Sequence, residues 1–202
     1  MLKKISFVIF ATLCVGIGLY PLVYALVEGT FGLLQSKSTT LLSSNVWNTA
    51  FYTHISLGGF ALLIGWVQFV KPIRIKYVTI HKTIGKCYVI TVLGSGLASL
   101  YIAYFATGGL IPSLGFTCLG LIWLYTTIKA YVAIRNRKIK QHQMFMIFSY
   151  AACFAAVTLR IWLPLLSSLF GEFLIAYKIV AWLCWVPNMI VAFMITRRLN
   201  LL

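Results

Sequence analysis

One stretch, residues 141–164 (QHQMFMIFSYAACFAAVTLRIWLP), constrains the fold of this chain more than any other. It is apolar, long enough to cross a membrane, and carries an ionisable residue near each end. His142 and Arg160 lie 18 positions apart, which is about five turns of an α-helix and about 27 Å along its axis. Because the hydrocarbon core of a bilayer is about 30 Å thick, the stretch predicts a membrane-spanning helix with both residues on one face.

That face also carries small or polar side chains, among them Ser149. Small residues allow a second helix or a flat ligand to approach closely. Residues 47–70 predict another such face, built around His54 and Gly58 at helical spacing. We therefore expect the two faces to pack against each other.

Composition limits the class of protein. Hydrophobic residues make up 61% of the 202 residues and charged residues only 9%, whereas about 25% of the residues in soluble domains are charged. We therefore expect one integral membrane domain, residues 1–202, with the lipid bilayer as its partner.

The net charge of +15 would suggest nucleic-acid binding in a soluble protein. Here 13 of the 17 lysines and arginines fall in four clusters at alternate ends of the hydrophobic runs, as the positive-inside rule requires. The basicity therefore indicates topology, and nucleic acid is not an expected partner.

The hydrophobic runs predict an all-α bundle of six transmembrane helices with both termini in the cytoplasm. The expected helices are residues 5–27, 47–70, 80–105, 113–134, 142–169 and 173–196. Pro187 and Asn188 predict a kink in the last helix. The long loop 28–46 is expected on the outer side, either as a plain solvated connection or as a lid over an outer site. The acidic residues Glu28 and Glu172 then fall on the outer side.

These helices place the candidate functional residues at two depths. His81 and His142 begin their helices at the cytoplasmic ends, and two facing imidazoles are the axial ligands that a b-type haem requires. Gly85, one turn from His81, leaves room for the porphyrin. The alternative is that both are interfacial histidines that bind nothing.

His54 and Arg160 lie at a similar depth near the outer side. Arginine stays charged, and a charge at membrane depth marks a functional site that needs a partner. A quinone oxygen, a haem propionate or a lipid headgroup would serve. The alternative is that Arg160 extends to the interface or caps backbone carbonyls.

Other chemistry is excluded or left open. The lack of a membrane-embedded acid excludes a Ser/His/Asp triad, and the lack of a third ligand beside either histidine pair excludes zinc. Five scattered cysteines predict neither a disulfide framework nor an iron–sulfur site. Whether the chain is an enzyme stays open.

Three segments carry a recurring pattern: HISLGGFALLIGWVQF, RIKYVTIHKTIGKCYV and IKQHQMFMIFSYAACFAAVTLRIWLP. The pattern residues are His54, Gln68, Phe69, His81, Lys82, Gly85, Lys86, Tyr88, His142, Met146, Ser149, Tyr150, Thr158, Leu159 and Arg160. Over about residues 51–164 the chain resembles a family of bacterial six-helix membrane proteins of unknown function. The resemblance implies the bacterial cytoplasmic (inner) membrane.

More distantly, the plan is similar to the transmembrane ascorbate-reducible b-type cytochromes, which hold two haems with two histidines each. This chain departs from that pattern because residues 113–134 contain no histidine. The resemblance therefore implies at most one haem held by two histidines.

Three functional hypotheses follow. The first is a redox protein with haem b between His81 and His142 and a quinone or other small molecule near His54, Arg160, Gly58 and Ser149. The second is a non-redox binding or transport protein that takes an anionic or lipid ligand at His54 and Arg160. The third is an assembly or scaffold subunit that buries its polar faces against a membrane partner.

Overall fold

The computed structural model describes residues 2–27 and 30–202, and Glu28 lies outside them. The helices are α1 (Leu2–Leu19), α2 (Pro21–Leu26), η1 (Gly32–Ser36), α3 (Thr39–Leu42), α4 (Asn45–Gly65), η2 (Trp66–Phe69), α5 (Lys71–Ile75), α6 (Val78–Tyr104), α7 (Leu110–Arg135), α8 (Ile139–Cys153), α9 (Ala155–Phe170), α10 (Phe173–Leu183) and α11 (Val186–Arg198).

Six segments of the described residues are long and apolar enough to cross a membrane. They are Lys4–Leu26, Asn45–Phe69, Val78–Tyr104, Leu110–Arg135, Ile139–Phe170 and Phe173–Arg198. Their ends lie within three residues of the ends expected from the sequence. The prediction of an all-α protein with six spans is therefore confirmed.

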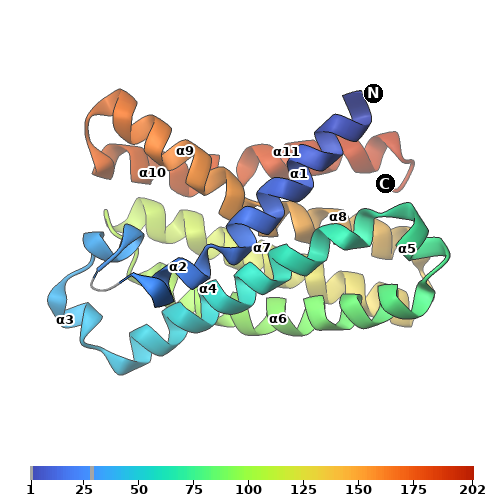
Figure 1. The fold of residues 1–202 in the computed structure, drawn as a ribbon, viewed down its shortest axis with the longest axis horizontal. Coiled ribbons are helices and arrows are strands. Elements are labelled where there is room, and N and C mark those ends of the chain that lie inside the picture. The colour runs from blue at the N-terminus through green and yellow to red at the C-terminus, as the bar shows by residue number, and fades with distance from the viewer. Residues whose placement is uncertain (1, 28–29) are drawn as a thin grey trace.

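Four helices form the centre of the bundle. Consecutive helices α4, α6, α7 and α8 pack side by side, and α8 also contacts α4. Around this group, α1 packs on α4, α10 packs on α7, and α11 packs on α8 (Figure 1). Short connections between antiparallel neighbours favour this arrangement.

The two ends of the bundle differ in charge. The first helix begins and the last helix ends at the same end as α5 (Figure 1). Basic residues from four segments gather there, so we call it the basic end: Lys3 and Lys4; Lys71, Arg74, Lys76, Lys82 and Lys86; Arg135, Arg137, Lys138 and Lys140; Arg197 and Arg198. The opposite end carries η1 and α3, and we call it the loop end. That the basic end faces the cytoplasm stays a prediction.

The fifth span is interrupted, although the sequence predicted one regular helix. At Phe154 the chain changes from α8 to α9, and the amide of Val157 donates to the carbonyl of Phe154 at 2.9 Å, a tightened three-residue bond. Figure 1 shows α9 leaving the central group and lying beside α10. The five-turn spacing of His142 and Arg160 therefore does not run through one straight helix.

A side-chain amide supports this break and a second one. The sixth span is interrupted between α10 and α11, next to the predicted kink at Pro187. The Asn188 amide nitrogen donates to the carbonyls of Ala151 (3.3 Å) and Cys184 (2.9 Å), one beside each break. Backbone carbonyls without a partner are costly in a bilayer, so Asn188 stabilises both breaks, together with the Thr158 hydroxyl, which also donates to the Cys184 carbonyl.

The middle of the bundle is closed by a ring of hydrogen bonds. Trp123 Nε1 donates to the Tyr88 hydroxyl (3.4 Å), which lies 2.9 Å from Ser149 Oγ. Ser149 Oγ lies 2.6 Å from Thr127 Oγ1, which donates to the Trp123 carbonyl at 2.7 Å. Because that carbonyl only accepts, Thr127 accepts from Ser149, and Ser149 in turn accepts from Tyr88. The ring therefore joins α6, α7 and α8 and leaves no proton of these hydroxyls unpaired.

Gly65 allows α8 to approach α4. A Cβ atom on Gly65 would lie 2.3 Å from the ring of Tyr150, closer than atoms can pack. That ring is held in place because the Tyr150 hydroxyl donates to the Leu62 carbonyl at 2.8 Å. Gly65 therefore provides the space that Tyr150 fills.

We expect Gly65→Ala to destabilise the protein, because Tyr150 cannot move without losing its hydrogen bond. Overpacking of this kind costs about 1–3 kcal/mol. The measurement is the midpoint of thermal unfolding in detergent. Gly16→Ala in α1 is the matched control, because a Cβ there meets nothing within 4 Å. Equal midpoints for the two variants would contradict the packing argument.

Candidate functional site

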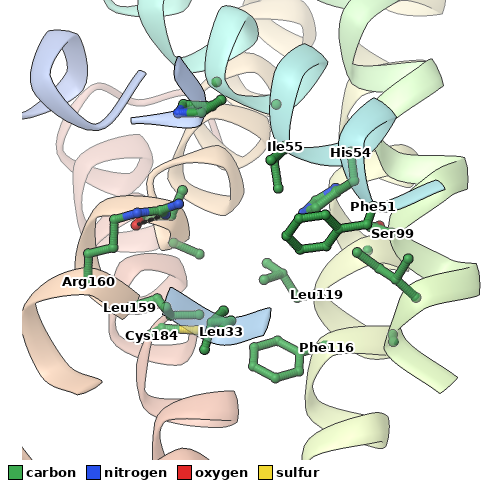
Figure 2. A pocket seen from close by; sticks show the side chains of 18 of the residues that line it. Leu33, Phe51, His54, Ile55, Ser99, Phe116, Leu119, Leu159, Arg160 and Cys184 are labelled. Carbon is green, nitrogen blue, oxygen red and sulfur yellow. Dashed lines mark hydrogen bonds between the residues drawn. The ribbon is translucent and has the colours of Figure 1, made fainter. Parts of the chain in front are cut away.

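A cavity of about 200 Å³ lies at the loop end, between α4 and α9. His54 and Arg160 both line it, and Figure 2 shows them on opposite sides with apolar side chains between. Apolar residues of nine elements form most of its surface, including Leu33, Phe51, Ile55, Phe116, Leu119, Trp123 and Leu159. The two outer residues singled out from the sequence therefore meet at one site.

Ser95 fixes the position of His54. The Ser95 hydroxyl donates to the His54 carbonyl at 2.9 Å, and its oxygen lies 3.0 Å from His54 Nδ1. The Ser95 carbonyl lies 3.1 Å from the same nitrogen. Gly58 leaves room for this contact, since a Cβ atom there would lie 2.9 Å from Ser95 Oγ. Gly58 thus belongs to the site both as a lining residue and as space for Ser95.

Arg160 is charged and has no carboxylate partner among the described residues. Its Nη1 donates to the Ala156 carbonyl at 2.9 Å, and its guanidinium carbon lies 4.3 Å from the centre of the Tyr20 ring. Its Nε is buried without a hydrogen-bond partner. Glu172 is exposed at the start of α10. Arg160 therefore retains hydrogen-bonding capacity that a ligand could satisfy.

The long loop covers this cavity at the loop end. Leu34 of η1 is buried, and Leu33, Leu34 and Lys37 line the cavity. Lys37 Nζ donates to the Phe105 carbonyl (2.6 Å) and to Thr107 Oγ1 (3.0 Å), both in the α6–α7 connection. Of the two readings of this loop, the structure therefore favours the lid.

The residues predicted to form the inner haem site lie away from this cavity. Neither His81, His142 nor Gly85 lines the cavity. His142 Nδ1 lies 2.9 Å from the Ala130 carbonyl, and His81 Nδ1 is buried without a partner. Ser149 also lies outside the cavity, in the hydrogen-bonded ring.

The comparisons with known proteins give one result. Residues 51–196 match a family model described as Predicted membrane protein (DUF2306). The chain belongs to the DUF2306 family. No curated protein and no solved structure matches it.

Sequence reasoning missed three residues that shape the site of this DUF2306 protein: Lys37, Ser95 and Tyr20. The sequence did offer a signal for Lys37, because it is the one cation in the segment 28–46, which is expected on the outer side, where cations are uncommon. Ser95 and Tyr20 had none, since only the folded chain places them against His54 and Arg160.

Burial of Lys37 makes the stability of the DUF2306 protein depend on pH. Burial lowers the pKa of Lys37 to about 8, whereas an unfolded lysine keeps its proton to about pH 10.4. Between these values the unfolded chain binds more protons, so the free energy of unfolding contributed by Lys37 rises with pH. We expect the thermal midpoint of the wild type, relative to Lys37→Met, to increase from pH 8 to pH 10. If the midpoints of the wild type and of Lys37→Met changed equally with pH, this prediction would be contradicted.

Proposed function

We propose that this protein binds, or transports, a small anionic molecule with an apolar body in the cavity between His54 and Arg160. One observation carries the proposal: Arg160 lines an apolar cavity with no carboxylate to neutralise it in the described chain. A charge in a low-dielectric site is costly unless it is paired. An anionic group of a ligand would supply that pairing.

Lys37 supports the proposal from a second side. Its ammonium lines the same cavity, and the two hydrogen bonds that it donates leave one proton for a ligand. Two cationic side chains that share one apolar cavity repel each other, and an anion between them removes that repulsion. The cavity therefore has the electrostatics of an anion site.

Size and lining define the body of the ligand. An engineered apolar cavity of about 150 Å³ binds benzene, so a cavity of about 200 Å³ accommodates one substituted ring. The lining is largely aromatic and aliphatic, which is typical of small-molecule sites with a few orienting polar groups. Benzoate is thus the simplest probe with the required features.

We expect benzoate to raise the thermal midpoint of the purified protein, because a ligand that binds only the folded state stabilises it. Benzamide, which has the same shape without the charge, should give a much smaller shift. Arg160→Gln should remove the benzoate shift, whereas Lys129→Gln, at an exposed cation on α7, should retain it. A benzoate shift that persists in Arg160→Gln would contradict the proposal.

A second candidate function is redox chemistry at His81 and His142, with a quinone as the ligand of the outer cavity. The observation that favours it is the hydrogen bond of His142. The Ala130 carbonyl only accepts, so His142 Nδ1 carries a proton and Nε2 is left without a partner. Metal-binding histidines are commonly oriented in this way.

The surroundings of His81 also fit a haem ligand. His81 Nδ1 and Gln68 Oε1 are both buried without partners, and the same Gln68 amide donates to the His81 carbonyl at 3.3 Å. Gln68 therefore offers an acceptor that would orient the His81 ring. A Cβ atom on Gly85 would meet nothing within 4 Å, so space is open one turn away. Haem b between His81 and His142 would supply one-electron transfer.

If this second function holds, protein expressed with a haem supply shows an alpha band in its reduced-minus-oxidised spectrum. His142→Leu should lose the band because one axial ligand is gone. His54→Leu should keep it, since His54 lies at the outer cavity. A folded wild-type protein without the band excludes the haem.

A further inference from the structure

We infer that the ligand of the outer cavity carries a hydrogen-bond donor, such as a phenolic hydroxyl, at the pole that faces His54, opposite the anionic group that faces Arg160. The inference rests on the proposed function and narrows its ligand class. It follows from the proton positions around Ser95, the charges around the cavity, and the placement of His54 and Arg160.

The hydrogen bonds of Ser95 decide which His54 nitrogen carries the proton. Ser95 has one hydroxyl proton, and it goes to the His54 carbonyl. The Ser95 oxygen can then only accept from His54 Nδ1, and the Ser95 carbonyl accepts as well. Both contacts therefore require a proton on Nδ1, which leaves Nε2 with the lone pair in the neutral imidazole.

The charges around the cavity favour that neutral imidazole. Arg160 and Lys37 already bring two cations to the cavity, and the titratable oxygen groups on its surface are the hydroxyls of Tyr24 and Tyr177. A third positive charge in an apolar cavity without a carboxylate is unfavourable. No described residue satisfies Nε2. The cavity thus presents one hydrogen-bond acceptor at His54 and donors at Arg160 and Lys37.

The geometry then fixes the order of groups along the ligand. Figure 2 shows His54 and Arg160 on opposite sides of the cavity, with Ile55, Leu119 and Leu159 at its apolar surface. A ligand that satisfies both poles has a donor at one end, an anion at the other and an apolar body between them. A ring with a carboxylate and a hydroxyl in para positions is a rigid molecule of this kind.

The test compares four probes of nearly equal size on the wild-type protein: benzoate, 4-fluorobenzoate, 4-hydroxybenzoate and 4-aminobenzoate. We expect the hydroxyl and amino compounds, which both donate, to bind at least about tenfold more tightly than the other two, the gain of one hydrogen bond to a buried acceptor. Isothermal calorimetry in detergent measures the four dissociation constants.

Two variants separate this inference from a general preference for polar ligands. His54→Leu should bind all four probes alike, whereas Ser95→Ala should keep the difference, because the backbone carbonyl of residue 95 still accepts from Nδ1 and leaves the lone pair on Nε2. Equal affinities of the four probes for the wild type would overturn the inference and leave the proposed function standing. Failure of all four to bind would overturn both.

Discussion

The break at Phe154 is the constraint on which the outer cavity depends. A straight continuation of α8 would stay beside α7, against which α8 already packs. Instead α9 leaves the central group and pairs with α10 (Figure 1), and residues from both sides of the break, Cys153 and Ala156 among them, line the cavity. In a bilayer such a break is stable only if its carbonyls find donors within the protein. Asn188 supplies one for each of the fifth and sixth spans, and the Thr158 hydroxyl supplies a second one to the Cys184 carbonyl.

The second determinant is an imbalance of charge. The sequence has 17 basic and two acidic residues, and of the two acids Glu172 is exposed while Glu28 lies outside the described residues. From Lys4 onward, the cations at the basic end are exposed. Arg160 and Lys37 instead line an apolar cavity. In such a medium of low dielectric constant, the interaction of a cation with another charge is stronger than in water. The Tyr20 ring and backbone carbonyls satisfy these cations only in part. The same imbalance that sets the expected topology therefore also underlies the proposed anion site at the opposite end.

Much of the fold was predictable because it depends on local pattern. Long apolar runs predicted all six spans, and the depth of His54 and Arg160 within their runs was enough to predict that they meet. The break at Phe154 was not predictable, because residues 141–164 contain a proline only at their end and the donor that stabilises the break comes from Asn188, more than 30 residues away. For the same reason the position of Ser149 on the predicted face suggested a ligand, whereas its partners Tyr88 and Thr127 come from other helices.

The hydrogen-bonded ring also bears on how the outer cavity and the inner histidines relate. Ser149 was expected near the small molecule of the outer site. The ring begins at the Trp123 side chain and returns to the Trp123 backbone. Each of its hydrogen bonds therefore joins two members of the ring, and none of them goes to His81 or His142. Tyr150, packed against Gly65, fills the adjoining space between α4 and α8. Among the described residues, the ring therefore provides no hydrogen-bonded path from the outer cavity to the inner histidines. Coupling between the two levels would then act through the packing of the helices.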